Sequence, residues 1–102
     1  MPTPIDPIHP GTFLRQELLE PLHLSQHAVA RATGLPTSRI NQILLGRRSV
    51  SAETDLRLCR YFGLSHGYLL RWQATYDQQI AERDLGAQID REVMPLELAE
   101  SV

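Results

Sequence analysis

A chain of 102 residues, 42% of them hydrophobic, is long enough to bury one core but too short to hold a separate catalytic domain beside it. Its single cysteine excludes an internal disulfide and makes a reducing cytoplasm the expected location. No N-terminal apolar segment and no stretch as long as a membrane span occur, so the sequence predicts neither a signal peptide nor a membrane contact.

The net charge of −2 is unevenly distributed. Residues 13–60 hold seven arginines against four acids, a local charge of +3, whereas residues 71–102 hold three arginines against seven acids, a local charge of −4. This asymmetry favours one surface that faces phosphates and another that faces a different partner. All ten basic residues are arginine, which suits forked contacts to phosphate or guanine but is equally typical of a GC-rich genome.

The prolines at positions 2, 4, 7 and 10 predict an extended N-terminal arm over residues 1–10. We expect a first helix to begin at a cap on Gly11 or Thr12 and to end at Pro21. Its apolar residues share one face and form the predicted core stripe, which consists of Phe13, Leu14, Leu18 and Leu19.

Two short helices joined by a tight corner follow. Ser25 is a typical N-cap for a helix over residues 26–33, and Gly34, which readily adopts positive φ, predicts the end of that helix. Pro36 pre-sets φ and lacks an N–H, so a second helix is expected to begin at about Thr37.

The second helix of the corner has an apolar side and a polar side. Ile40, Ile43 and Leu44 follow the spacing of a core stripe, which leaves hydrogen-bonding side chains on the opposite face. Reading the DNA major groove requires such a corner, although a purely structural helix pair has the same pattern. Gln26 favours DNA because a side chain at the start of the first helix can reach a phosphate. The DNA-contacting residues that we predict are Gln26, Thr37, Ser38, Arg39, Asn41, Gln42, Arg47 and Arg48.

A fourth helix is predicted from the cap Ser51 to Phe62, where Gly63 ends it. Leu56, Cys59 and Phe62 recur at helical spacing and are expected to line its inner face. Cys59 is therefore predicted to be a small core residue and not a nucleophile.

The expected fold is all-α, with five helices in a domain over residues 11–85. The fifth helix begins at a cap on Ser65 and ends at Asp84 or Leu85, where a glycine interrupts the helical pattern. Residues 86–102 are expected to be a short, acidic and mostly irregular tail.

An apolar stripe runs along this long fifth helix. Aromatic residues at helical spacing are usually core residues, and part of the stripe is expected to be core. A helix of about 30 Å in so small a domain also exposes its distal apolar positions unless a second copy covers them. We therefore predict a homodimer on operator DNA that carries an inverted repeat. The predicted interface residues are Leu69, Trp72, Tyr76 and Ile80.

Residues that could support catalysis or metal binding are few. His23 and His27 have the spacing of metal ligands, but His23 precedes the helix cap and no third ligand is near in sequence. Glu17 and Glu20 lack a predicted pocket and are expected to be exposed charges. The sequence therefore predicts no metal, no cofactor and no catalytic residue, and a small hydrolase or metal-dependent enzyme is the weaker alternative.

The chain also resembles a known family. Its corner is similar to the helix-turn-helix of the Cro and phage-repressor class at Ser25, Gln26, Val29, Ala30, Gly34, Ile40 and Gly46. From Ile8 to about Arg83 it resembles HigA-type antitoxins more closely, through the series HPG, LRQELLEPL and SRIN. A co-linear match of this length is far more specific than a lone short motif.

The resemblance implies an antitoxin that neutralises a cognate HigB-type RNase toxin and represses its own operon. It also implies DNA contacts at four of the positions predicted above: Gln26, Thr37, Ser38 and Gln42. The chain departs from the family at Gly67, which is expected to weaken the first turn of the fifth helix by up to about 1 kcal/mol. The alternative is a free-standing transcriptional regulator without a toxin, which the gene beside it would distinguish.

Overall fold

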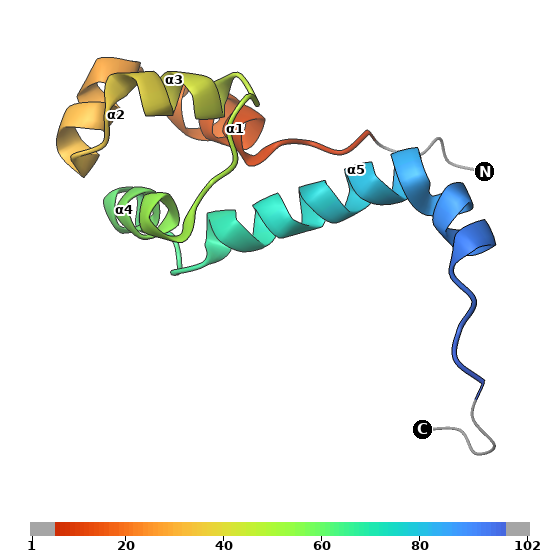
Figure 1. Cartoon of the computed structure of the whole chain (residues 1–102). Coiled ribbons are helices and arrows are strands. Elements are labelled where there is room, and N and C mark those ends of the chain that lie inside the picture. Colours follow the sequence, from red (N-terminus) through yellow and green to blue (C-terminus); the bar gives the residue numbers. More distant parts are fainter. Residues whose placement is uncertain (1–5, 98–102) are drawn as a thin grey trace.

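The computed structural model describes residues 6–97, so the predicted arm residues 1–5 and tail residues 98–102 lie outside it, and the described residues form no strand. The helices are α1 (Pro10–Phe13), the π-helical segment η1 (Leu14–Leu19), α2 (Gln26–Thr33), α3 (Thr37–Leu44), α4 (Ala52–Phe62) and α5 (Tyr68–Glu92). Because η1 continues α1 without a break, the described chain contains the five helical segments that were predicted. The helices from α1 to α4, including η1, pack together into a group that we call the head, and α5 projects from it (Figure 1).

The first helix begins earlier than predicted. Its N-cap is His9, whose Nδ1 atom accepts a hydrogen bond from the Gly11 N–H at 2.9 Å. The predicted caps Gly11 and Thr12 lie inside the helix, after Pro10 at its first position. Gly11 has a different role, because a Cβ there would overlap the backbone carbonyl oxygen of Ile43 in α3. The glycine therefore lets the first helix and α3 approach closely.

Helices α2 and α4 have the predicted bounds, and α3 begins at Thr37 as predicted. Ser25 and Ser51 cap α2 and α4 by accepting hydrogen bonds from the N–H groups of Ala28 and Thr54, respectively. Apolar side chains from all the helices meet in one core beneath them. The buried hydrophobic residues are Leu14, Leu19, Val29, Ala30, Leu35, Ile40, Ile43, Leu44, Val50, Leu58, Cys59 and Leu69.

The inner face of α4 differs from the prediction at one position. Cys59 is fully buried and Phe62 packs against the core, as expected, but Leu56 is 49% exposed. Asp55 faces inward instead, and Leu58 is buried beside it. The reason is that the Asp55 carboxylate finds hydrogen-bond donors inside the domain. Burial also raises the pKa of the Cys59 thiol, which makes it a poor nucleophile.

The start of α5 corrects two predictions. Ser65 is not its cap, because the helix begins only at Tyr68, whose N–H donates to the Ser65 carbonyl oxygen at 3.1 Å. Gly67 does not weaken the first turn, because it lies before the helix with a φ of 86°, a conformation that favours glycine.

The C-terminal end of α5 is also corrected, since the helix runs to Glu92 and does not stop at Asp84 or Leu85. Gly86 lies inside it, and the helix-forming residues on both sides outweigh its local cost of about 1 kcal/mol. The 25 residues of α5 follow a path of about 37 Å, and the helix bends in its last turns (Figure 1). Beyond Ile80 the described side chains are exposed, where α5 stands away from the head (Figure 1).

The described part of the N-terminal arm lies against α5. The Trp72 indole N–H donates a hydrogen bond to the Ile8 carbonyl oxygen at 2.7 Å, and the Trp72 ring lies 4.5 Å from the Phe13 ring. The rings of His9 and Tyr76 meet edge to face with their centroids 5.1 Å apart. Side chains of α5 that were expected to need a second copy therefore have partners within the protomer.

These contacts change the expected dimer interface. Leu69 is fully buried in the core of its own protomer, so its assignment to the interface is wrong. Trp72 and Tyr76 are partly buried by the arm and the first helix, and Ile80 is partly buried where α5 leaves the head. Beyond Ile80, α5 carries two further large apolar residues that are exposed, Leu85 and Ile89.

Candidate nucleic-acid interface

The corner between α2 and α3 is closed by Gly34, as predicted. Gly34 has a φ of 73°, and its N–H donates to the Ala30 carbonyl oxygen at 2.9 Å, which ends α2. Leu35 then anchors the corner in the core, and Pro36 occupies the N-cap position of α3. As a result α3 begins at Thr37, two residues after this buried anchor.

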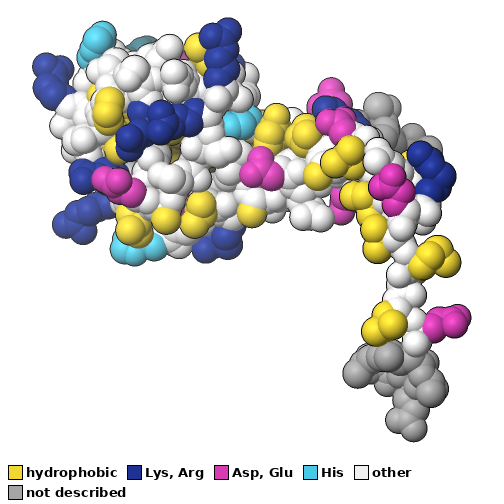
Figure 2. Space-filling model, viewed as in Figure 1, with side chains coloured by type: hydrophobic (Ala, Val, Ile, Leu, Met, Phe, Trp, Pro, Cys, Tyr) yellow, Lys and Arg dark blue, Asp and Glu magenta, His cyan; other side chains and the backbone are white. Residues whose placement is uncertain are grey.

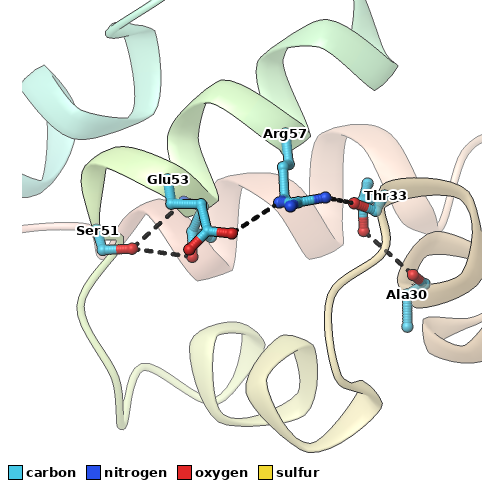
Figure 3. A network of polar contacts seen from close by, with 6 residues as sticks. Ala30, Thr33, Ser51, Glu53 and Arg57 are labelled. Carbon is cyan, nitrogen blue, oxygen red and sulfur yellow. Dashed lines mark hydrogen bonds and ion pairs between the residues drawn. The ribbon is translucent and has the colours of Figure 1, made fainter.

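Arg57 of α4 holds the C-terminal end of α2 (Figure 3). Its Nη1 atom donates to the Thr33 carbonyl oxygen at 2.9 Å, and its Nε atom donates to the Glu53 carboxylate at 3.0 Å. A cation is favourable at this end of a helix because the unpaired carbonyl groups make it partially negative. The Thr33 hydroxyl donates to the Val29 carbonyl oxygen at 2.7 Å, which satisfies this buried group locally. Arg57 and Glu53 are well exposed, so their ion pair adds little stability and serves mainly to place the guanidinium.

The outward side of α3 carries the predicted base-reading residues. Ser38 and Gln42 are exposed and lie one helical turn apart on the same face. Thr37, Arg39 and Asn41 are partly buried. The Arg39 Nε atom is buried and has no hydrogen-bond partner among the described residues, so part of this side chain packs on the protein. Hydroxyl and amide groups on such a face can donate to and accept from base edges.

Three more predicted residues flank α3. Gln26 is the first residue of α2 and is partly exposed, while Arg47 and Arg48 are exposed in the loop after α3. The Arg47 N–H donates to the Gln42 carbonyl oxygen at 2.8 Å, so this loop begins as a direct continuation of the helix end. On the face shown in Figure 2, dark blue arginine side chains gather on the head, and most acidic side chains lie along α5 and the chain beyond it. The positive part of the charge pattern therefore lies on the head, which carries α3.

Gln73 of α5 braces the loop that follows α3. It is 4% exposed, and its Oε1 atom accepts a hydrogen bond from the Val50 N–H at 3.0 Å. Its Nε2 atom donates to Asp77 at 3.0 Å. Neither the contact of Gln73 nor that of Arg57 could be predicted from local sequence, because their partners lie 23 and 24 residues away. The only local signal for Gln73 was a polar residue beside the apolar stripe of α5.

His9 lies where the arm, the α3 loop and α5 meet, and it is 7% exposed. Burial lowers the pKa of His9, while the Asp77 carboxylate and a hydrogen bond with the Arg48 backbone oppose that shift. The cap contact requires an unprotonated Nδ1 atom, since this atom accepts the Gly11 N–H. A protonated ring would also be repelled by the partial positive charge at the N-terminus of α1.

Among residues 6–97, no group of three or more His, Cys, Asp or Glu side chains is placed to hold a metal ion. No helix in that same range is both long enough and apolar enough to cross a membrane. The groups that surround α3 are hydroxyl, amide and guanidinium groups, which suit hydrogen bonding to a polar or anionic ligand.

A tight two-helix corner that presents a polar helical face beside exposed arginines defines a helix-turn-helix protein. Residues 14–69, which are more than half of the chain, match the family described as helix-turn-helix. Virulence-associated protein I of Dichelobacter nodosus is 48% identical to the chain over 77 residues, which cover 76% of this chain and 71% of that protein.

Two solved structures narrow the family further. An addiction-module antidote protein of a HigA family from Coxiella burnetii is 38% identical with a TM-score of 0.84, and the match covers 90% of this chain and 100% of that one. The antitoxin HigA of Pseudomonas aeruginosa, solved with the higBA promoter, is 37% identical with a TM-score of 0.85, and the match covers 89% of this chain and 99% of that one. The chain belongs to the helix-turn-helix family and, within it, to the HigA-type antitoxins.

Proposed function

We propose that this antitoxin binds operator DNA by placing α3 in the major groove. The observation that carries the proposal is the two-sided character of α3, which buries Ile40, Ile43 and Leu44 while Ser38 and Gln42 stay exposed. A helix offered in this way at a tight corner can reach base edges with its exposed side chains. The structure of the Pseudomonas HigA with its promoter supports the same role for this chain.

We assign base contacts and phosphate contacts to different residues, because base contacts specify a sequence whereas phosphate contacts position the protein. The candidate base contacts all lie on α3 and are Thr37, Ser38, Arg39, Asn41 and Gln42. The candidate phosphate contacts lie at the start of α2 and in the loop after α3, and they are Gln26, Arg47 and Arg48.

A second copy of the chain is proposed to cover the distal half of α5. Leu85, Ile89 and the cap residue Val93 recur every four residues and are 46%, 46% and 62% exposed. At this spacing they form one apolar stripe, and uncovered stripes of this kind mark association surfaces. Two copies related by a two-fold axis would present their α3 helices to half-sites about 34 Å apart, so the operator is expected to be an inverted repeat.

The toxin is proposed to be a HigB-type RNase that contacts the acidic part of this chain. Residues 71–102 carry a local charge of −4, and a protein that binds RNA usually has a basic surface. Complementary charge raises the rate of encounter more than the final affinity, so added salt should slow association. The cytoplasm is the location that suits both an operator and an mRNA-cleaving partner.

Co-expression with the neighbouring gene tests this function. We expect that gene's product alone to stop growth and growth to return when this protein is made as well. Gln42→Ala serves as the matched variant, because it should lose operator repression but still neutralise the toxin. If the neighbouring product does not inhibit growth, or inhibits it equally with and without this protein, a free-standing regulator without a toxin replaces the proposal.

A further inference from the structure

We propose that Asp55 is a positioning residue that fixes the direction in which α5 leaves the head, and that it thereby sets the spacing of the two half-sites that a dimer reads. This inference rests on the proposed homodimer on α5. Asp55 belongs to α4, yet its Oδ2 atom accepts a hydrogen bond from the Gly67 N–H at 2.7 Å. Its Oδ1 atom accepts a second one from the Leu70 N–H at 2.9 Å.

Helix α5 has no side-chain cap of its own. Gly67 at the N-cap position has no side chain, and the side chain of Leu70 at the third helical position has no hydrogen-bond acceptor. In a capping box, two local side chains satisfy the N–H groups of these two positions, one each. Here one carboxylate from 12 and 15 residues upstream accepts both N–H groups. The start of α5 is therefore held by a different helix.

Because Asp55 is buried, losing its hydrogen bonds to the start of α5 would cost free energy. The side chain is 1% exposed, and its third recorded partner is the Cys59 thiol at 3.4 Å. Backbone N–H groups at a helix N-terminus stabilise a carboxylate, because that end of the helix carries partial positive charge. A tilt of α5 that withdrew these N–H groups would leave a buried carboxylate without compensation, which is strongly unfavourable.

A small rotation at this point would be amplified along α5. The helix bends in its last turns (Figure 1), and about 27 Å of it separate its start from Leu85, so a tilt of about 10° at its start moves Leu85 by about 5 Å. That displacement exceeds one base-pair step of about 3.4 Å. The proposed dimer stripe begins at Leu85 in the distal half of α5, so the tilt would change the separation of the two α3 helices in the dimer.

Other contacts would keep α5 on the head if the Asp55 contact were lost. Further along the helix, Gln73 accepts a hydrogen bond from the Val50 N–H, and Trp72 donates one to the Ile8 carbonyl oxygen. An Asp55→Asn variant is therefore expected to fold and to keep α5 in contact with the head. The angle at which α5 leaves the head should become variable.

The test compares wild-type protein and Asp55→Asn on a series of operator duplexes. The operator is first selected from random duplexes with the wild-type protein, and base pairs are then added or removed between its half-sites. A two-base-pair change should cost the wild-type protein about tenfold or more in affinity, whereas Asp55→Asn should bind all spacings within about threefold of one another. Both should bind an isolated half-site alike. Glu17→Gln, which removes an exposed carboxylate of η1, should keep the wild-type preference.

The outcomes separate the two proposals. An Asp55→Asn variant with the wild-type spacing preference overturns the positioning role but leaves the dimer standing. A wild-type protein without any spacing preference removes the dimer and the positioning role together. If Asp55→Asn does not fold, amide hydrogen exchange of the wild-type protein is measured instead. The reference is the His27 amide, which lies in the first turn of α2 and has no hydrogen-bond partner in the described chain. After correction for intrinsic rates, the Gly67 and Leu70 amides should exchange about tenfold or more slowly than the His27 amide. Equal rates would overturn the cap.

Discussion

The Trp72 indole N–H donates a hydrogen bond to the Ile8 carbonyl oxygen at 2.7 Å, across 64 positions of sequence. This contact fastens an arm without regular structure to the first half of α5. The arm in turn brings His9 to the start of the first helix, where it forms the cap. Arm, first helix and α5 therefore form one packed unit, to which the helix-turn-helix corner is attached.

Removing the Trp72 donor should loosen this unit by a modest amount. Trp72→Phe keeps an aromatic ring against Phe13 but loses the hydrogen bond to Ile8, so the free energy of unfolding in urea should fall by about 1 kcal/mol. Tyr61→Phe, at a ring that is 40% exposed, is the matched control and should change little. A Trp72→Phe variant as stable as the control would mean that the arm contact contributes nothing.

Two glycines should respond to alanine with opposite signs. Gly11→Ala would drive a methyl group into the Ile43 carbonyl oxygen, and we expect a loss of about 3 kcal/mol or more in unfolding free energy. Gly86→Ala meets no atom within 4 Å and lies inside a helix, so it should increase the helical signal and stabilise α5 by about 0.5–1 kcal/mol. Circular dichroism during thermal unfolding measures both. Similar effects from the two variants would contradict the close contact of the first helix with α3.

Stability should depend on pH through His9. Because burial lowers its pKa below the ordinary value of 6.5, the folded protein binds fewer protons than the unfolded chain in that range. The contribution of His9 is therefore complete above pH 6.5 and is lost as the pH falls through the lowered pKa. His9→Ser retains a cap oxygen but does not titrate, so its urea midpoint should vary less between neutral and mildly acidic pH.

The control for this experiment is His27→Gln, which removes an exposed histidine and should keep the wild-type pH dependence. If His9→Ser and the wild-type protein lost stability equally on acidification, another group would be responsible.

The proposed dimer stripe is tested by substitutions that leave the protomer core intact. Leu85→Asp or Ile89→Asp places a charge at a position that is 46% exposed in the protomer, so the variants should fold. They should nevertheless sediment as monomers at concentrations where the wild-type protein is dimeric, because the charge would be buried in the interface. Ala87→Asp, at an exposed position on the opposite side of the same helix, should stay dimeric. A wild-type monomer at micromolar concentration that bound one half-site as tightly as the full operator would rule the dimer out.

The helix-turn-helix corner could be predicted from sequence because its determinants are local. Ser25, Gly34 and Pro36 act on their immediate neighbours, and the stripe of α3 follows a helical period. The start of α5 could not be predicted in this way. Its cap is supplied by Asp55, at a distance of 12 residues, and a local search for a capping side chain led to Ser65 instead.

The C-terminal end of α5 was mispredicted for a related reason. Gly86 carries a real but small helical cost, and its neighbours form helix well enough to continue through it. Leu69 was predicted as an interface residue because a helical period does not reveal that it is buried in the core of its own protomer, and it does not reveal the partner of Trp72 in the arm either. Local patterns therefore predicted the DNA-facing corner better than the attachment of α5.

The most direct test of the account is a binding titration of the operator and a scrambled duplex at one fixed salt concentration. Ser38→Ala or Gln42→Ala should weaken operator binding by about 1–3 kcal/mol and leave binding to the scrambled duplex almost unchanged, because these exposed side chains of α3 are the proposed base contacts. Arg47→Ala should weaken both duplexes alike, because it is a proposed phosphate contact. If Gln42→Ala instead lost the same affinity on both duplexes, α3 would not be reading sequence, and the assignment of this helix to the major groove would be contradicted.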